Sequence, residues 1–174
     1  MNPRDTGRRV VIGVGNDYRR DDGFGPAVVG GLIDRQGIDP RLTAVDLRVS
    51  DGEPTRLIDL WTGADLAVVV DAVLDDGHHA GHRYELVLES LDELSEERSA
   101  SSHGISLGST VALGRALGRL PRRLVVLAVS GTEFGFGQGL TGPVADAVSP
   151  VIERACELVG EICPDPVTPR AGGH

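Results

Sequence analysis

Three short runs of the chain contain almost only apolar residues, and they constrain the fold more than any other feature. The runs are Val10–Val14, Leu66–Val70 and Leu124–Val129. Such runs are typical of strands that are buried on both faces, as in parallel sheets covered by helices. Segments with helical spacing separate the runs, and prolines favourable to a first helical turn occur at Pro26, Pro54 and Pro143. This alternation predicts an α/β fold with a mainly parallel sheet.

Weaker patterns complete the predicted architecture. Leu42–Leu47 alternates as a second strand, and Tyr84–Leu88 is expected to be an antiparallel edge strand, because the loop before it is too short for a helical crossover. A helix is expected near Ser106, with Val111, Leu113, Leu117 and Leu120 as its apolar positions. Pro150 should kink the last helix or start a new one. We therefore expect a three-layer α/β sandwich: a mainly parallel twisted sheet of about five strands, one of them antiparallel, with helices on both faces.

Length and charge limit the classes of function. The 174 residues fit one domain, expected over residues 1–163, with residues 164–174 as a disordered tail. A net charge of −9 gives no electrostatic footprint for nucleic acid. The hydrophilic start, without a leader or a membrane span, favours a cytoplasmic protein. Cys156 and Cys163 are the only cysteines, and we expect both to be reduced structural thiols.

The loop after the first apolar run is rich in glycine, yet it does not match a dinucleotide-binding loop. That fingerprint needs a third glycine three residues after the second, and Tyr18 occupies this position after Gly13 and Gly15. Asp21 and Asp22 follow, and two carboxylates would repel a phosphate. The loop therefore favours a cation over a nucleotide.

Three residues from distant segments are expected at one edge of the sheet. Asp22 follows the first strand, Asp71 ends the Leu66–Val70 run, and His103 precedes a predicted helix. Ligands of open α/β sheets bind beyond the carboxyl ends of the strands, where these residues should meet. Two carboxylates and one imidazole suit a divalent ion such as zinc, nickel or manganese, with positions left for water or substrate.

Each residue also has a simpler interpretation. Asp21 and Asp22 could stabilise the N-terminus of the next helix, Asp71 could cap a turn, and His103 could lie on the surface. The stretch 75–82, with His78, His79 and His82, is a second candidate metal site, although turn chemistry accounts for its glycines. The chain contains no H-E-x-x-H, the metal-binding motif of zinc proteases.

The order of these motifs resembles the hydrogenase maturation endopeptidases. The motifs are Gly13-Val14-Gly15-Asn16, Asp21-Asp22-Gly23-Phe24-Gly25, Val70-Asp71-Ala72, Ser102-His103 and the glycine-rich stretch Phe134–Pro143. The resemblance extends from about Val10 to Val159. It implies a protease that removes the C-terminal extension of a nickel-iron hydrogenase large-subunit precursor after nickel insertion.

The resemblance also implies roles for particular residues. Asp22, Asp71 and His103 correspond to the family's metal-contacting and catalytic residues. The nickel would belong to the substrate, and no organic cofactor is expected. Asp51 would contact substrate, although relatives often have D-G-G-T where this chain reads Asp51-Gly52-Glu53-Pro54. The expected partner is the hydrogenase large-subunit precursor, and a monomer is expected rather than a stable oligomer.

Two mechanisms and three other classes of function stay open at this point. A metal ion could polarise the scissile carbonyl or lower the pKa of a bound water, or it could only dock the substrate while a carboxylate acts as general base. A peptidase of the same fold with another substrate is one alternative. A second alternative is a receiver-like signalling domain, whose acids should directly follow the first strand and whose last strand should end in a lysine. Asp22 lies too far from the first strand, and Ser130-Gly131-Thr132 after the last strand contains no lysine, so both features disfavour this interpretation. A nucleotide-binding module lacks the third glycine.

Overall fold

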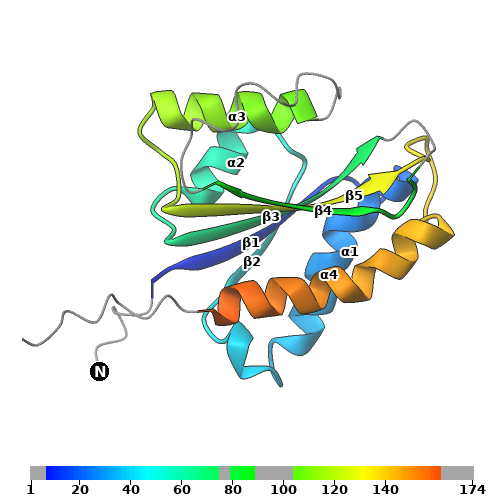
Figure 1. Ribbon diagram of the computed structural model, residues 1–174, viewed down its shortest axis with the longest axis horizontal. Coiled ribbons are helices and arrows are strands. Elements are labelled where there is room, and N and C mark those ends of the chain that lie inside the picture. Colours follow the sequence, from blue (N-terminus) through cyan, green and yellow to red (C-terminus); the bar gives the residue numbers. More distant parts are fainter. Residues whose placement is uncertain (1–6, 75–78, 89–103, 162–174) are drawn as a thin grey trace, which may run out of the picture.

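The computed structural model describes residues 7–74, 79–88 and 104–161, which form one five-stranded sheet with helices on both faces (Figure 1). The strands are β1 (Arg9–Val14), β2 (Asp46–Ser50), β3 (Leu66–Leu74), β4 (Arg83–Leu88) and β5 (Arg123–Gly131). Their order is β2-β1-β3-β5-β4; β4 runs antiparallel to β5, and the other neighbours are parallel. The predicted fold class, including the single antiparallel edge strand, is confirmed.

The helices form one layer on each side of this sheet. They are α1 (Phe24–Arg35), α2 (Pro54–Trp61), α3 (Gly104–Ala116) and α4 (Gly142–Gly160), with short 3₁₀ helices η1 (Arg20–Gly23) and η2 (Pro40–Leu42). Helices α1 and α4 cover one face, and α2 and α3 cover the other (Figure 1). None of the helices in the described ranges is long and apolar enough to cross a membrane.

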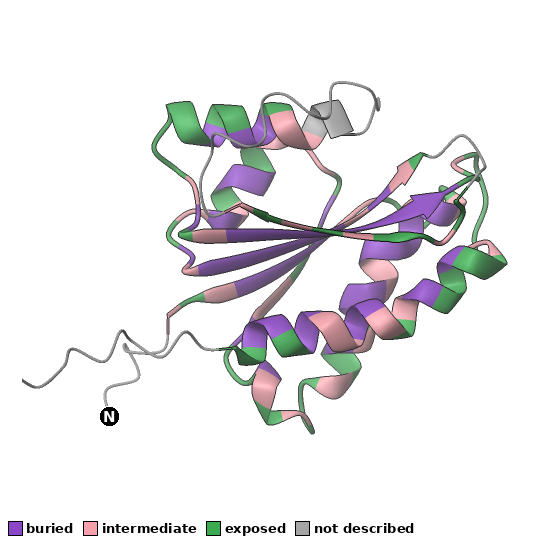
Figure 2. Cartoon of the chain, viewed as in Figure 1, coloured by how far each residue is buried: buried purple, intermediate pink, exposed green. Residues whose placement is uncertain are grey.

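Each face of the sheet has its own buried cluster, because successive side chains of a strand point to opposite faces. Val11, Val68 and Val125 pack with α1 and α4, whereas Val10, Ile12 and Ala67 pack with Trp61 of α2 and with α3. Figure 2 shows the central strands buried along most of their length, with exposed residues on the outer sides of the helices. The near-continuous apolar runs of the sequence are thus explained by burial on both faces.

Several expected boundaries are wrong. The second strand begins at Asp46, because Leu42 is buried within η2, whose first residue is Pro40. Strand β3 continues beyond Asp71 to Leu74, since β5 pairs with it over this whole length. Helix α4 passes through Pro150 as one helix and does not restart there.

The apolar face of α3 also differs from the prediction. Leu113 and Leu117 are exposed, whereas Leu107 is partly buried in the cluster and Thr110 and Val111 are fully buried. Gly114 completes a face with i, i+3, i+4, i+7 spacing, and a Cβ there would contact Leu120 and Trp61. The small residues on this face were not recognised as buried because periodicity counts only apolar side chains. Residues 162–174, including Cys163, lie outside the described ranges, so the predicted domain limits stay predictions.

Candidate active site

The glycines of the first loop allow η1 and α1 to approach the strands closely. A Cβ on Gly15, whose φ is +143°, would collide with the backbone oxygen of Asp22. A Cβ on Gly25 would lie 2.5 Å from the carbonyl oxygen of Val14 and 2.7 Å from that of Val70. The loop is also tied to β2, because the Gly15 N–H donates to the Ser50 carbonyl at 3.0 Å. These glycines bring the acidic loop onto the carboxyl ends of β1 and β3.

Asp21 is fully buried and joins this loop to the loop between β5 and α4. Its carboxylate accepts hydrogen bonds from the backbone N–H groups of Thr132, Glu133 and Thr141 at 2.8–3.0 Å, and from the Thr141 hydroxyl. Burial alone would raise the pKa of Asp21, but these hydrogen bonds outweigh it and hold the pKa below its ordinary value. Asp21 therefore holds the two loops together and does not cap α1.

Asp22 points toward the pocket from the end of η1. Its carboxylate accepts from the Asn16 N–H at 3.1 Å, which fixes the side chain against its own loop. The N-cap residue of α1 is Gly23, and no side chain caps this helix, so Asp22 does not cap α1 either. A favourable interaction of these two charges with the N-terminus of α1, the simpler interpretation, stays a prediction.

Asp71 faces Asp22 from β3, and its carboxyl group is in an unusual electrostatic position. Burial is the main cause that raises its pKa, the negative charge of Asp22 adds to this effect, and one hydrogen bond from the Ala72 N–H partly offsets it. The pKa of Asp71 is raised to about 7 as a result. A carboxyl group of this kind exchanges a proton near neutral pH, which is the range in which a general acid or base is effective.

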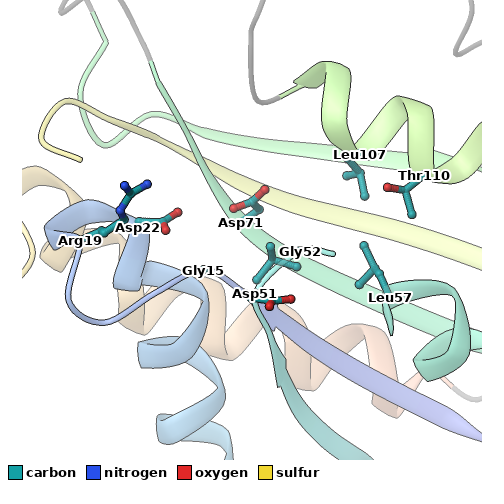
Figure 3. A pocket seen from close by; sticks show the side chains of 10 residues that line it. Gly15, Arg19, Asp22, Asp51, Gly52, Leu57, Asp71, Leu107 and Thr110 are labelled. Carbon is teal, nitrogen blue, oxygen red and sulfur yellow. The ribbon is translucent and has the colours of Figure 1, made fainter. Parts of the chain in front are cut away.

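These residues line a pocket of about 360 Å³ at the carboxyl edge of the parallel strands (Figure 3). Asp22 and Arg19 lie on one side, Asp71 lies at the centre, and Asp51 lies below it. The opposite side is formed by Leu57 of α2 and by Leu107 and Thr110 of α3. The pocket thus combines three acidic side chains, one basic side chain and an apolar wall.

Asp51, the predicted substrate contact, is exposed at the pocket. Its carboxylate accepts from the Glu53 N–H at 3.0 Å and pairs with Arg56 at 2.8 Å. Glu53 caps α2 by accepting from the N–H groups of Thr55 and Arg56. The Asp51–Glu53 stretch therefore shapes the start of α2, and it leaves one carboxylate at the pocket.

His103, the third predicted ligand, lies outside the described residues, directly before α3. Within the described ranges no three histidine, cysteine or acidic side chains come together as a metal site. This applies also to the second candidate, in which the His79 and His82 rings are exposed and lie 6.1 Å apart, while His78 is outside the described ranges. The structure brings Asp22 and Asp71 together and leaves the role of His103 a prediction.

Sequence reasoning missed Arg19 and Thr110 as pocket residues, and it missed the clamp formed by Asp21. Thr110 could have been found from its spacing with Leu107, Val111 and Gly114 on one helix face. The contacts of Asp21 join residues more than a hundred positions apart, so no local pattern reveals them. For Arg19, the sequence offers no indication of a place at the pocket beyond its proximity to Asp22 along the chain.

The fold and the site define a class of protein: an α/β sandwich with facing carboxylates at the carboxyl edge of its parallel strands. Within this class, the family model for HycI, the hydrogenase maturation protease, matches residues 46–158. The chain belongs to the hydrogenase maturation protease family. It is accordingly a hydrolase that acts on peptide bonds.

Individual relatives agree with this assignment. The chain is 28% identical, over 156 residues, to the hydrogenase expression/formation protein HupD of Bradyrhizobium diazoefficiens, covering 88% of this chain and 79% of that protein. The fold is similar to that of the hydrogenase maturating endopeptidase HybD from Escherichia coli, with a TM-score of 0.67, 24% identity, and coverage of 85% and 89% of the two chains. It is also similar to the HybD protease from Thermococcus kodakarensis, with a TM-score of 0.62, 23% identity, and coverage of 87% and 99%.

Proposed function

We propose that this protein removes a C-terminal extension from the large-subunit precursor of a nickel-iron hydrogenase after nickel has been inserted. The observation that carries the proposal is the meeting of Asp22 and Asp71 at one pocket in a chain of the maturation protease family. Carboxylate oxygens are suitable ligands for a divalent ion, and these two come from separate segments that the fold holds in place.

The nickel belongs to the precursor and is therefore part of the substrate. Asp22 and Asp71 would contact it from two sides of the pocket, and His103 is the proposed third ligand. Recognition of the metal in this way would couple cleavage to nickel insertion, because a precursor without nickel offers the carboxylates no counter-charge and leaves two acids facing each other.

Asp71 is the proposed general base when the nickel only docks the substrate. Without bound metal, burial and the negative charge of Asp22 raise the pKa of Asp71 to about 7. In this mechanism Asp71 accepts a proton from a water molecule and does not itself bind the nickel. In the alternative mechanism, the precursor's metal polarises the scissile carbonyl and the three side chains hold it. Variants that separate metal contact from cleavage distinguish these two mechanisms.

Asp51 and the apolar wall are the proposed contacts for the substrate chain. The exposed Asp51 carboxylate lies at the pocket, and Leu57 and Leu107 offer apolar surface opposite Asp22. We further propose that the protein acts as a monomer in the cytoplasm, without an organic cofactor. A peptidase with a substrate other than a hydrogenase is the alternative that the following experiment addresses.

The experiment incubates the protein with nickel-loaded and nickel-free precursor of the host's hydrogenase large subunit and follows intact mass. Loss of a C-terminal peptide from the nickel-loaded form alone is the expected result. Cleavage of both forms would contradict the role of nickel. Failure to cleave either form would remove the hydrogenase precursor as substrate and favour the alternative peptidase.

A further inference from the structure

Two of the chain's few aromatic side chains are strongly exposed beside the pocket. Phe136 is 89% exposed and Tyr18 is 65% exposed, whereas Trp61 and Phe24 are fully buried. The sequence contains only six aromatic residues of these types, namely three Phe, two Tyr and one Trp. Exposed aromatic rings next to a binding pocket are typical of interaction sites, where they supply large contact areas.

The two exposed rings belong to loops that are hydrogen-bonded to each other. The Gly137 N–H donates to the Tyr18 carbonyl at 2.9 Å, and the Arg20 N–H donates to the Gly137 carbonyl at 3.0 Å. Asp21 adds the buried hydrogen bonds to Thr132, Glu133 and Thr141 described above. The rings are therefore presented on a backbone that is already ordered, which lowers the entropy lost on binding.

Arg19 connects these rings to the pocket. Its guanidinium carbon lies 5.7 Å from the centroid of the Phe136 ring, and its side chain lines the pocket beside Asp22 (Figure 3). Arg19 is the one basic residue among the described pocket residues, whose other charged members are acidic. A guanidinium that stacks on an aromatic ring keeps its hydrogen-bond donors free for a carboxylate.

We infer that Tyr18, Arg19 and Phe136 form a docking rim for the precursor protein, in which Arg19 binds a substrate carboxylate next to the cleavage segment and the two rings contact apolar surface. This inference rests on the proposed function. The rim determines affinity for the substrate and takes no part in the chemical step. The position of Arg19 at the pocket, its positive charge and its stacking on Phe136 favour a carboxylate of the precursor over other occupants.

The test measures KM and kcat for nickel-loaded precursor with rim variants and matched control variants. Arg19→Gln and Phe136→Ala should each raise KM about tenfold or more, as expected for central interface residues, with kcat nearly unchanged. The matched controls lie at the opposite edge of the sheet: Arg122→Gln removes an exposed charge, and Ile38→Ala removes an exposed apolar side chain that is 84% exposed. Both controls should behave like the wild type.

Salt dependence separates the two parts of the rim. An Arg19–carboxylate contact predicts that the wild-type KM rises with ionic strength, that Arg19→Gln flattens this dependence and that Phe136→Ala retains it. Arg19→Lys should retain the salt dependence with an intermediate KM, because it keeps the charge and loses the planar stacking. A wild-type KM in the Arg19 and Phe136 variants overturns the inference. Failure of the wild type to cleave overturns the proposed function instead, so the two failures are distinguishable.

Discussion

The carboxyl group of Asp71 destabilises the folded protein when it is ionised. Its pKa is raised to about 7 in the folded state, so between about pH 4 and pH 7 the folded protein holds a proton that the unfolded chain has lost. Each pKa unit corresponds to about 1.4 kcal/mol, so ionisation of Asp71 lowers the free energy of unfolding by a few kcal/mol at most. Carboxyl groups with raised pKa values that destabilise the fold in this way are common in active sites, where they transfer protons.

Asp71→Asn should therefore stabilise the protein in a pH-dependent manner. The gain in free energy of unfolding, relative to the wild type, should grow from pH 4 to pH 7 and then stay constant. Chemical denaturation at pH 4.5 and pH 8 measures this difference. An equal effect of the substitution at both pH values would show that Asp71 has an ordinary pKa.

Asp21 is the opposite case, because its ionised form is stabilised by the fold. In the wild type, backbone N–H groups donate to both carboxylate oxygens of Asp21. Asp21→Asn replaces one of these oxygens with an NH₂ group, which cannot accept these hydrogen bonds. We therefore expect the free energy of unfolding to fall by about 1–3 kcal/mol at pH 7. Asp17→Asn, an exposed residue of the same loop, is the control. Because the pKa of Asp21 is lowered, its contribution should disappear as the pH falls below about 4. Equal stability of both variants at pH 7 would contradict the conclusion that Asp21 holds the two loops together.

The site could be predicted from the sequence only in part, and the reason is visible in these residues. Asp22 follows β1 and Asp71 lies just after the apolar run of β3. Both are therefore near the carboxyl edge of the sheet, where parallel strands bring distant segments together. Asp21, one position before Asp22, could not be assigned because its partners lie on a distant loop. Arg19 could not be assigned because a single arginine in a polar loop is most often solvated.

At the level of secondary structure, Gly25 and Gly30 of α1 should respond oppositely to the same substitution. A Cβ at Gly25 would press on the Val14 and Val70 carbonyls, whereas a Cβ at Gly30 has nothing within 4 Å. Gly25→Ala should lower the free energy of unfolding by about 1–3 kcal/mol. Gly30→Ala should raise it by about 0.5–1 kcal/mol, because it removes a flexible residue from a helix interior.

Thermal or chemical denaturation of both variants checks this pair. Activity adds a second readout, since Gly25→Ala also displaces the loop that carries Asp22 and should reduce cleavage beyond the loss of folded protein. Equal effects of the two substitutions would show that the close approach of α1 to the strands does not matter.

The strands that are buried on both faces were predictable, while edge elements were less so. β1, β3 and β5 lie in the interior of the sheet, so they consist mostly of apolar residues and can be recognised from the sequence alone. β2 lies at an edge and contains Asp46 and the exposed Arg48 and Val49, so its weak pattern predicts a start at Leu42, four residues before the true start at Asp46. Edge strands carry weaker patterns because only one face needs to be apolar.

The described residues that line the pocket lie together at the carboxyl edge of the parallel strands. The pocket lies beyond the carboxyl ends of β1, β2 and β3, and the paired loops with Tyr18 and Phe136 adjoin it. This arrangement lets a protein substrate contact the rim and the carboxylates at the same time. We propose that Asp71 and Asp22 form the centre of the active site at this edge.

The most direct test is an intact-mass time course of nickel-loaded precursor with the wild type, Asp71→Asn and Asp59→Asn. Asp59 is an exposed acid on α2 that pairs only loosely with Arg119 at 3.4 Å, so its variant controls for the loss of one charge. We expect Asp59→Asn to cleave at the wild-type rate and a folded Asp71→Asn to cleave at least about 100-fold more slowly. Cleavage by Asp71→Asn at the wild-type rate would contradict this proposal.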